Sequence, residues 1–281
     1  MKKIASLLFV LCFITTQAQT KDPLLTKDKK AQEKWVNNIL NKMTNEEKIG
    51  QLLIVQAYST NDSLNEKKVE ELIRKYHAGS LIFMQGTPKK QAELTNKYQT
   101  LSKYPLLVSI DAEWGLDMRL KNSFRYPWNM TLGAVRDNSL IEKFGEQLGK
   151  HCNRLGIHIN FAPVVDININ PKNPIIGNRS FGENKKNVTD KAIALTRGMQ
   201  RFGVMANAAA DSHHTLPVVD FDMKRLDTLE LYPYYKLFNE NIGSVMTAHM
   251  SIPKLEPNKT LPSSLSKKIT TGLLKEKMGF K

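Results

Sequence analysis

A carboxylate and an imidazole stand one residue apart in the segment Asp211-Ser212-His213. An imidazole has an unperturbed pKa of about 6.5, so His213 could give and take a proton at neutral pH. The carboxylate of Asp211 could fix the ring orientation and stabilise the imidazolium. Taken by itself, the segment is read more simply as an ordinary turn, because Asp and Ser are common turn residues.

Acids and histidines stand at the ends of several apolar, strand-like runs. They are Asp111 after residues 105–111, Asp166 after residues 156–166, Asp211 and His213 after residues 203–208, and His249 after residues 243–249. In a β/α barrel the active site forms at the carboxyl ends of the strands. Each Asp could instead be a helix N-cap, but that reading does not explain why polar residues recur at this position.

The elements that must position these residues are short apolar runs that alternate with amphipathic segments. The strand-like runs are residues 49–55, 78–84, 105–111, 156–166, 203–208 and 243–249, and the helix-like segments are residues 69–76, 88–102, 139–155, 188–201 and 224–241. Short buried strands alternating with helices indicate βα units and a parallel sheet. Six units without a glycine-rich phosphate loop favour a (β/α) barrel over a doubly wound sheet. We therefore predict an α/β fold of the TIM-barrel type.

The composition is that of a soluble globular protein, with 41% hydrophobic and 24% charged residues in 281. The formal net charge of +14 comes from basic pairs scattered along the chain. These pairs are not interleaved with aromatic residues, so we expect a solvated basic surface and no nucleic acid partner. Affinity for an anionic wall polymer is compatible with this charge.

The first nineteen residues are typical of a bacterial secretory signal peptide. Lys2 and Lys3 precede an apolar run at residues 4–14, and small polar residues follow, with cleavage expected after Ala18 or Gln19. The apolar run is too short to span a membrane stably. A lipoprotein anchored at Cys12 stays an alternative. We expect a periplasmic or extracellular protein with a linker at residues 20–34, one domain at residues 35–281 and no stable membrane insertion.

The single cysteine outside the signal peptide, Cys152, leaves no internal disulfide and lies in a helix-like segment, so we expect it to pack in the core. The sequence contains no ligand spacing of the zinc type. We therefore predict no metal and no organic cofactor.

Four segments give the chain a family resemblance: "IDAEWGLDMRL", "NFAPVVDININPKNPIIGNRSFG", "DSHHTLPVVDFD" and "VMTAHMSIP". The chain resembles the catalytic barrel of family 3 glycoside hydrolases, in the β-N-acetylglucosaminidase branch. The resemblance runs from about Trp35 to the end of the sequence. It implies a (β/α)8 barrel domain, here without its last βα units.

The resemblance implies a sugar-binding role for three residues. Asp111 and Arg119 match the family's sugar-binding pair, and Arg179 matches a further sugar-binding arginine. A carboxylate accepts from neighbouring hydroxyls and a guanidinium donates in a fixed fork, which suits a sugar. The alternative is that these residues form salt bridges that hold the loops. Between Asp111 and Arg119, Trp114-Gly115-Leu116-Asp117 replaces a Gly-Gly-Arg-Val-like run of many members.

Two further residues are expected to support this site. Asp166 matches a family position after the fourth strand, and its expected role is to organise the loop that bears Arg179. His249 is expected to be a structural residue near the site.

The resemblance also implies that His213 is the general acid/base and Asp211 its partner. Two departures stand beside it. Family members carry a Lys-His-Phe-Pro-Gly-His-Gly run before this aspartate, whereas here only Ala209-Ala210 separate the end of the strand-like run at residues 203–208 from Asp211. The aspartate nucleophile of the family would lie beyond Lys281, so the chain as given is expected to be inactive.

The implied function of the full-length parent is the removal of terminal, non-reducing N-acetyl-β-D-glucosamine residues, with retention. Peptidoglycan fragments or other glycans are the expected carbohydrate partners. A non-catalytic carbohydrate-binding remnant is the first alternative. A basic, exported adhesion or scaffold protein is the second, and the retained sugar-binding residues argue against it.

Overall fold

Six parallel strands form one sheet in the computed structural model, which describes residues 28–208 and 218–280. The strands are β1 (Ile54–Ser59), β2 (Ser80–Gly86), β3 (Leu107–Ile110), β4 (Ile159–Asn160), β5 (Met205–Ala208) and β6 (Ser244–Val245). The α-helices are α1 (Lys29–Leu40), α2 (Asn45–Gly50), α3 (Ser63–Tyr76), α4 (Pro88–Leu101), α5 (Asn129–Gly133), α6 (Asn138–Arg154), α7 (Lys185–Gln200), α8 (Met223–Thr228) and α9 (Tyr232–Asn239). The structure also contains the 3₁₀ turns η1 (Leu116–Met118), η2 (Gly177–Arg179) and η3 (Ser263–Leu265) and a π-helix, η4 (Lys268–Lys277).

Each strand pairs with the next one along the chain, in the order β1-β2-β3-β4-β5-β6. All five pairings are parallel. A sequential order is that of a β/α barrel, whereas a doubly wound sheet reverses its order at a switch point. The predicted barrel-type α/β fold is confirmed. Within the described residues β1 and β6 are edge strands, so this sheet is open.

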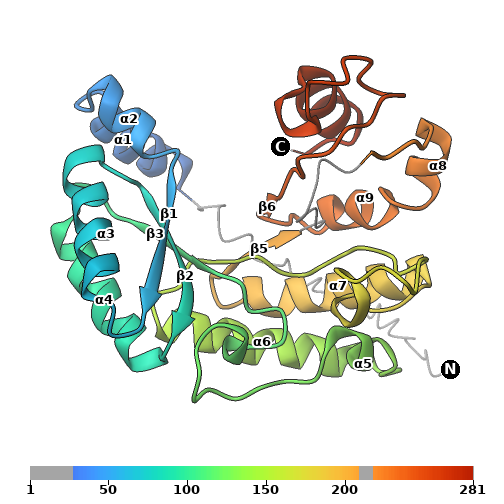
Figure 1. Ribbon diagram of the computed structural model, residues 1–281, viewed down its shortest axis with the longest axis horizontal. Helices are drawn as coiled ribbons and strands as arrows, with labels where there is room; N and C mark the ends of the chain where they lie inside the picture. The colour runs from blue at the N-terminus through green and yellow to red at the C-terminus, as the bar shows by residue number, and fades with distance from the viewer. Residues whose placement is uncertain (1–27, 209–217, 281) are drawn as a thin grey trace, which may run out of the picture.

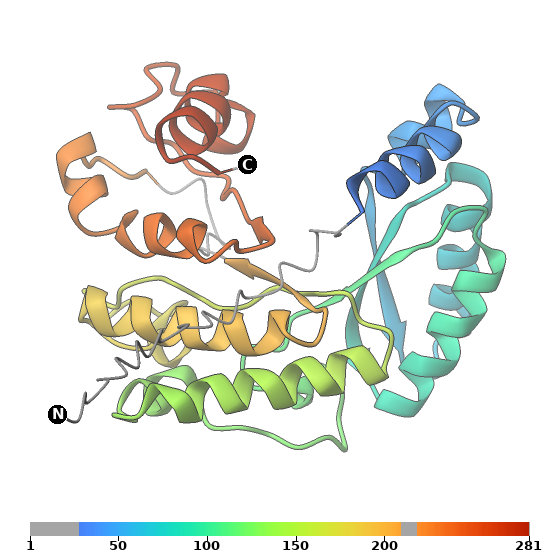
Figure 2. The same ribbon diagram turned by 180° about the vertical axis from the view of Figure 1, so that it is seen from behind.

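Helices cover the sheet as the alternating pattern requires (Figure 1). In both views α6 and α7 lie side by side, and α8, α9 and η4 form a lobe beyond β6, at the opposite end of the molecule from α1 and α2 (Figure 2). Glycines allow α6 and α7 to approach closely. A Cβ added to Gly145 would lie 2.5 Å from the carbonyl oxygen of Leu195, and one added to Gly198 would lie 2.3 Å from that of Glu142.

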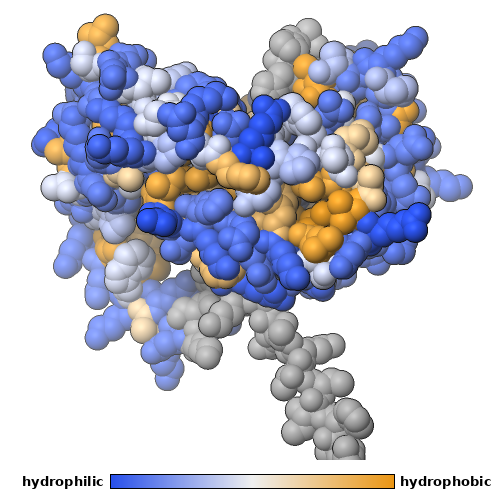
Figure 3. Space-filling view, turned by 90° about the horizontal axis from the view of Figure 1, so that it is seen from below, coloured by the Kyte–Doolittle hydropathy of each residue, from blue (hydrophilic) through white to orange (hydrophobic). Residues whose placement is uncertain are grey.

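One apolar core lies between the sheet and these helices, and it includes fully buried residues such as Leu81, Ile110, Leu148 and Leu195. Seen from below, hydrophilic residues cover most of the visible face and apolar residues gather in separate patches (Figure 3). No helix in residues 28–208 and 218–280 is long and apolar enough to cross a membrane.

The start of the predicted first strand at residues 49–55 is wrong, because β1 begins only at Ile54, and residues 49 and 50 are the end of α2. Thr44 starts this helix with a capping box: its hydroxyl accepts from the Glu47 amide at 3.2 Å, and the Glu47 carboxylate accepts from the Thr44 amide at 2.9 Å. Two amide donors at the helix start are satisfied in this way, which outweighs the strand propensity of the apolar run.

The single helix predicted at residues 224–241 is two helices, α8 and α9. Pro233 stands in the first turn of α9. Proline lacks an amide donor and clashes with the preceding turn, so it begins a helix well but interrupts one.

Three other bounds differ from the prediction. The strand expected at residues 156–166 is limited to β4, since Pro163 has no amide to donate to a ladder. The strand expected at residues 243–249 is limited to β6. Helix α1 begins at Lys29 and extends across the boundary expected between residues 34 and 35.

Cys152 is buried in the core, as predicted, and burial raises the pKa of its thiol to about 12. The thiolate is the reactive form of cysteine. We expect iodoacetamide at pH 8 to leave Cys152 unmodified in the folded protein and to modify it after unfolding in guanidinium chloride. Mass spectrometry of the peptide that carries Cys152 measures both reactions. Rapid labelling of the folded protein would contradict this burial.

Candidate functional site

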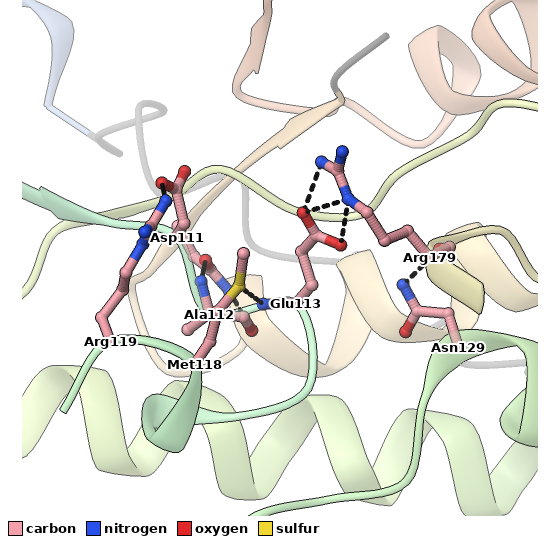
Figure 4. A network of polar contacts seen from close by, with 8 residues as sticks. Asp111, Ala112, Glu113, Met118, Arg119, Asn129 and Arg179 are labelled. Carbon is pink, nitrogen blue, oxygen red and sulfur yellow. Dashed lines mark hydrogen bonds and ion pairs between the residues drawn. The ribbon is translucent and has the colours of Figure 1, made fainter. Parts of the chain in front are cut away.

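Asp111 and Arg119 form an ion pair directly after β3 (Figure 4). The Nη2 atom of Arg119 donates to the Oδ2 atom of Asp111, and about a fifth of each side chain is exposed. Turn η1 brings the chain back over eight residues, so that the arginine faces the acid at the strand end. The pair presents a carboxylate and a guanidinium together to solvent at the carboxyl end of the sheet.

Arg179, on turn η2, forms a second ion pair with Glu113, whose side chain is only 3% exposed. Its Nε atom lies 3.1 Å from both carboxylate oxygens, and its Nη2 atom lies 2.7 Å from Oε1. Figure 4 shows the two side chains pointing toward one another from separate loops. The alternative interpretation of Arg179, a salt bridge that holds the loops, is therefore present in the structure.

Two buried asparagines fix the backbone around these pairs. Asn160, on β4, accepts from the Ala112 amide at 2.9 Å and so holds the residue between the two acids. Asn129, at the start of α5, donates to the carbonyl oxygen of Arg179 at 2.8 Å. Arg179 is thus held at its backbone by Asn129 and at its guanidinium by Glu113, and a side chain held at both ends is pre-oriented.

Burial raises the pKa of Glu113, and the hydrogen bonds from Arg179 oppose that rise. The charges of Asp111 and Arg119 also act on Glu113, which indicates that the two ion pairs form one cluster. Sequence reasoning named three of these four residues and missed Glu113. The signal was available, because residues two apart in an extended segment point to the same side.

Asp166 lies beside this cluster and holds the Arg179 loop through its backbone. The Ser180 hydroxyl donates to the Asp166 carbonyl oxygen at 2.6 Å. Burial raises the pKa of the Asp166 carboxyl to about 7, against the opposing charge of Arg179. Its Oδ2 atom accepts no hydrogen bond from the described residues.

The remaining predicted site residues either make no contact with the two ion pairs or fall outside the residues that the structure describes. His249 is exposed, and its Nδ1 atom lies 2.6 Å from the hydroxyl of Ser264. The Ser263 hydroxyl bonds the Ala248 carbonyl, which fastens η3 to the segment after β6. Asp211 and His213 fall in residues 209–217, outside the described residues.

An apolar cavity of about 410 Å³ lies between β6, α8, α9 and η4, with Asp166 on its wall. Its lining is mostly aliphatic, so it offers few partners for sugar hydroxyls. Neither Asp111 nor Arg179 lines it, and we place the candidate site at the ion pairs instead. In residues 28–208 and 218–280 no three His, Cys, Asp or Glu side chains are grouped as metal ligands would be.

Comparison with known proteins gives concordant matches. The profile of the glycosyl hydrolase family 3 N terminal domain matches residues 44–281. The chain is 31% identical to beta-hexosaminidase A of Pseudoalteromonas piscicida over 76% of its own length and 41% of the relative's. It is 25% identical to a beta-N-acetylglucosaminidase/beta-glucosidase of Cellulomonas fimi, over 88% of this chain and 46% of that protein.

A solved structure is similar over most of the chain. The beta-N-acetylglucosaminidase of family 3 from Paenibacillus sp. str. FPU-7 superposes with a TM-score of 0.77 at 35% identity. The match covers 85% of this chain and 48% of that protein. The chain thus spans less than half the length of these three relatives.

Proposed function

Because the chain belongs to glycosyl hydrolase family 3, we propose that it provides the sugar-binding part of a β-N-acetylhexosaminidase site. The proposed reaction is hydrolysis of a terminal, non-reducing N-acetyl-β-D-glucosamine residue, with retention at the anomeric carbon. Two relatives named for hexosaminidase or N-acetylglucosaminidase activity support this substrate class.

The observation that carries the proposal is the pair of carboxylate–guanidinium contacts at the carboxyl ends of neighbouring strands. Asp111 can accept from sugar hydroxyls, while Arg119 and Arg179 can donate to hydroxyls or to an acetamido oxygen. Within each pair the negative carboxylate balances the positive guanidinium, so the site has no net charge from these four residues and suits a neutral sugar. Because Glu113 and Asn129 hold Arg179, a sugar would meet donors that are already oriented.

The proposed chemistry rests on the sequence. We assign His213 as the general acid/base and Asp211 as the group that orients its ring. An imidazole with a pKa near neutrality can protonate the leaving oxygen and later accept a proton from water. The carboxylate nucleophile of a retaining mechanism stays part of the proposal for the whole protein.

N-Acetylglucosamine should stabilise the folded chain and raise its melting temperature. A ligand at a hundred times its Kd contributes about 2.7 kcal/mol to the free energy of unfolding. Asp111→Asn should weaken the affinity roughly 10–150-fold, since a hydrogen bond to a charged group contributes about 1.5–3 kcal/mol. Titration followed by differential scanning fluorimetry measures both effects.

Asp190→Asn is the matched control, because Asp190 lies on the surface of α7, where it pairs with Lys186. This variant should bind the sugar like the parent chain. If saturating N-acetylglucosamine leaves the melting temperature of the parent chain unchanged, the sugar-binding proposal is wrong.

A carbohydrate-binding protein without turnover is the second candidate, and the same ion pairs favour it. An aryl N-acetyl-β-glucosaminide assayed with the whole protein separates the two. Binding without release of the aryl group supports the second candidate, and release with retention supports the first.

We also propose export to the periplasm or exterior and wall fragments as the natural substrate. The basic and apolar order of residues 2–14 supports the export proposal. Cell fractionation of a tagged chain, with sequencing of its mature N-terminus, tests it.

A further inference from the structure

Asn160, the last residue of β4, continues the pairing with β3 through its side chain after the backbone ladder stops. The ladder ends where Ile110 pairs with Asn160. Beyond it, the Oδ1 atom of Asn160 accepts from the Ala112 amide at 2.9 Å, and its Nδ2 atom donates to the Ala112 carbonyl oxygen at 3.3 Å. The Gly115 amide also donates to this carbonyl oxygen, at 3.4 Å. Buried backbone groups need such partners, and one side chain contacts both groups of Ala112.

This contact is fully buried and fits only one orientation of the Asn160 amide. Asn160 and Ala112 both have no exposed surface. The side chain has an oxygen that accepts and a nitrogen that donates, so turning it over would match neither backbone group of Ala112. Its Nδ2 atom also lies 3.3 Å from the sulfur of Met199, a weak acceptor. The peptide groups on both sides of Ala112 are therefore fixed.

Ala112 separates Asp111 and Glu113, the acids of the two ion pairs. Figure 4 shows the carboxylates of Asp111 and Glu113 on the same side of this segment. The two peptide groups between these acids are the ones that Asn160 contacts. The spacing of the two ion pairs is therefore set from β4, within the sheet, as well as by the loops that bear the two arginines.

We propose that Asn160 is a positioning residue for specificity: by fixing the spacing of the two ion pairs, it makes the site distinguish N-acetylglucosamine from its epimers. Epimers carry the same hydroxyl and acetamido groups and differ in the direction of one of them. One ion pair alone could bind either sugar. Two pairs at a fixed spacing leave a polar group unpaired when one substituent points elsewhere, which weakens binding. The inference rests on the proposed function and adds to it a choice among N-acetylhexosamines.

The test compares the affinities of the full chain for N-acetylglucosamine and for two of its epimers, N-acetylgalactosamine and N-acetylmannosamine. The parent chain should prefer N-acetylglucosamine roughly 5–150-fold, the effect of leaving one polar group unpaired. Asn160→Ala should remove most of this preference, because both bonds to Ala112 are lost. Isothermal titration calorimetry on folded protein measures the three affinities. A change that only loosened the fold would weaken all three affinities by the same factor.

Asn160→Asp keeps the shape of the side chain and should recover its effect when protonated. A protonated carboxyl has an oxygen that accepts and a hydroxyl that donates, as the amide does, whereas a carboxylate only accepts. Burial raises the pKa of a carboxyl, so the preference should be lost at pH 8 and regained at pH 5. Asp111 and Glu113 flank Ala112 and also titrate, so each value is compared with that of the parent chain at the same pH. A packing defect would not be reversed by protonation.

Met199→Leu is the matched control, because it removes the sulfur beside Asn160 and keeps both bonds to Ala112. Leucine and methionine have similar volumes, so this variant should keep the preference of the parent chain. Equal affinities of the parent chain for the three sugars would overturn the role of Asn160 and leave the proposed function standing. An unchanged preference in Asn160→Asp at pH 8 would overturn it as well. If none of the three sugars binds, both this role and the proposed function are wrong.

Discussion

Arg179→Ala should lower the free energy of unfolding by about 3–5 kcal/mol at pH 8, the usual result of removing one partner from a buried ion pair. The cause is Glu113, whose side chain is 3% exposed and would lose all three hydrogen bonds that Arg179 donates. The same change should weaken N-acetylglucosamine binding roughly 10–150-fold, because a charge-assisted donor is lost.

The stability deficit of Arg179→Ala should shrink as the pH falls. Burial already raises the pKa of Glu113, and losing the hydrogen bonds from Arg179 raises it further. A carboxyl with a raised folded pKa binds its proton more tightly in the folded than in the unfolded state, so folding gains stability below that pKa. Urea unfolding at pH 5 and pH 8 measures the difference.

A double variant separates the two consequences. Glu113→Gln added to Arg179→Ala removes the buried charge and should restore part of the stability. It should not restore sugar affinity, since the guanidinium is still missing. Recovery of both properties would contradict a sugar contact by Arg179 and leave it a purely structural residue.

Arg197→Ala is the control for a general effect of arginine loss. Arg197 contacts Glu240 with two hydrogen bonds of 2.7 Å, but 40% of its side chain is exposed. A surface pair contributes about 0–1 kcal/mol, so this variant should stay near the parent chain in stability and in sugar affinity.

The alternation of apolar runs and helical segments was sufficient to predict the sheet and the end at which its polar residues gather. In a parallel sheet the carboxyl ends of all strands lie at the same edge, so the sequence alone predicts that Asp111 and Asp166 lie on the same side of the sheet. The family resemblance added Arg119 and Arg179. The roles of Asp211 and His213 stay predictions, because they lie outside the described residues.

What the sequence did not reveal depends on contacts between distant segments. Glu113 and Arg179 are 66 residues apart, and only the return of η2 over the end of β3 brings them together. The error at α2 had a different origin. Its capping signal, Thr44 followed three residues later by Glu47, was visible but was overlooked beside an apolar run that looked like a strand.

The raised pKa of Asp166 is also a property of the folded chain alone. It arises from burial beside the cavity that α8, α9 and η4 close, and those segments follow Asp166 by more than fifty residues. The sequence indicated only that an acid ends this run. The structure adds that its Oδ2 atom accepts no hydrogen bond from the described residues and that its charged form is disfavoured.

Asp166→Asn should raise the free energy of unfolding at pH 8 by about 2–4 kcal/mol. The folded pKa of Asp166 is raised from 3.8 to about 7 by burial, and each pKa unit corresponds to about 1.4 kcal/mol. The folded parent chain holds this proton more tightly than the unfolded chain does. Its stability therefore decreases as the pH rises from about 4 to about 7. The asparagine variant has no charge to bury, so its advantage should disappear at pH 4.

Asp137→Asn is a control of opposite sign, because the hydrogen bonds from Ser139 lower the pKa of Asp137 at the start of α6. This variant should lose stability at pH 8 and less at pH 4. Urea unfolding of the parent chain and both variants at pH 4, 6 and 8 gives the comparison.

The sugar affinity of Asp166→Asn shows whether the site depends on the backbone or on the carboxylate of Asp166. The bond from Ser180 ends on the Asp166 backbone and survives the substitution, so affinity should persist. A loss of affinity in Asp166→Asn would instead make the carboxylate a direct sugar contact, and its cost in stability would then be a cost of function.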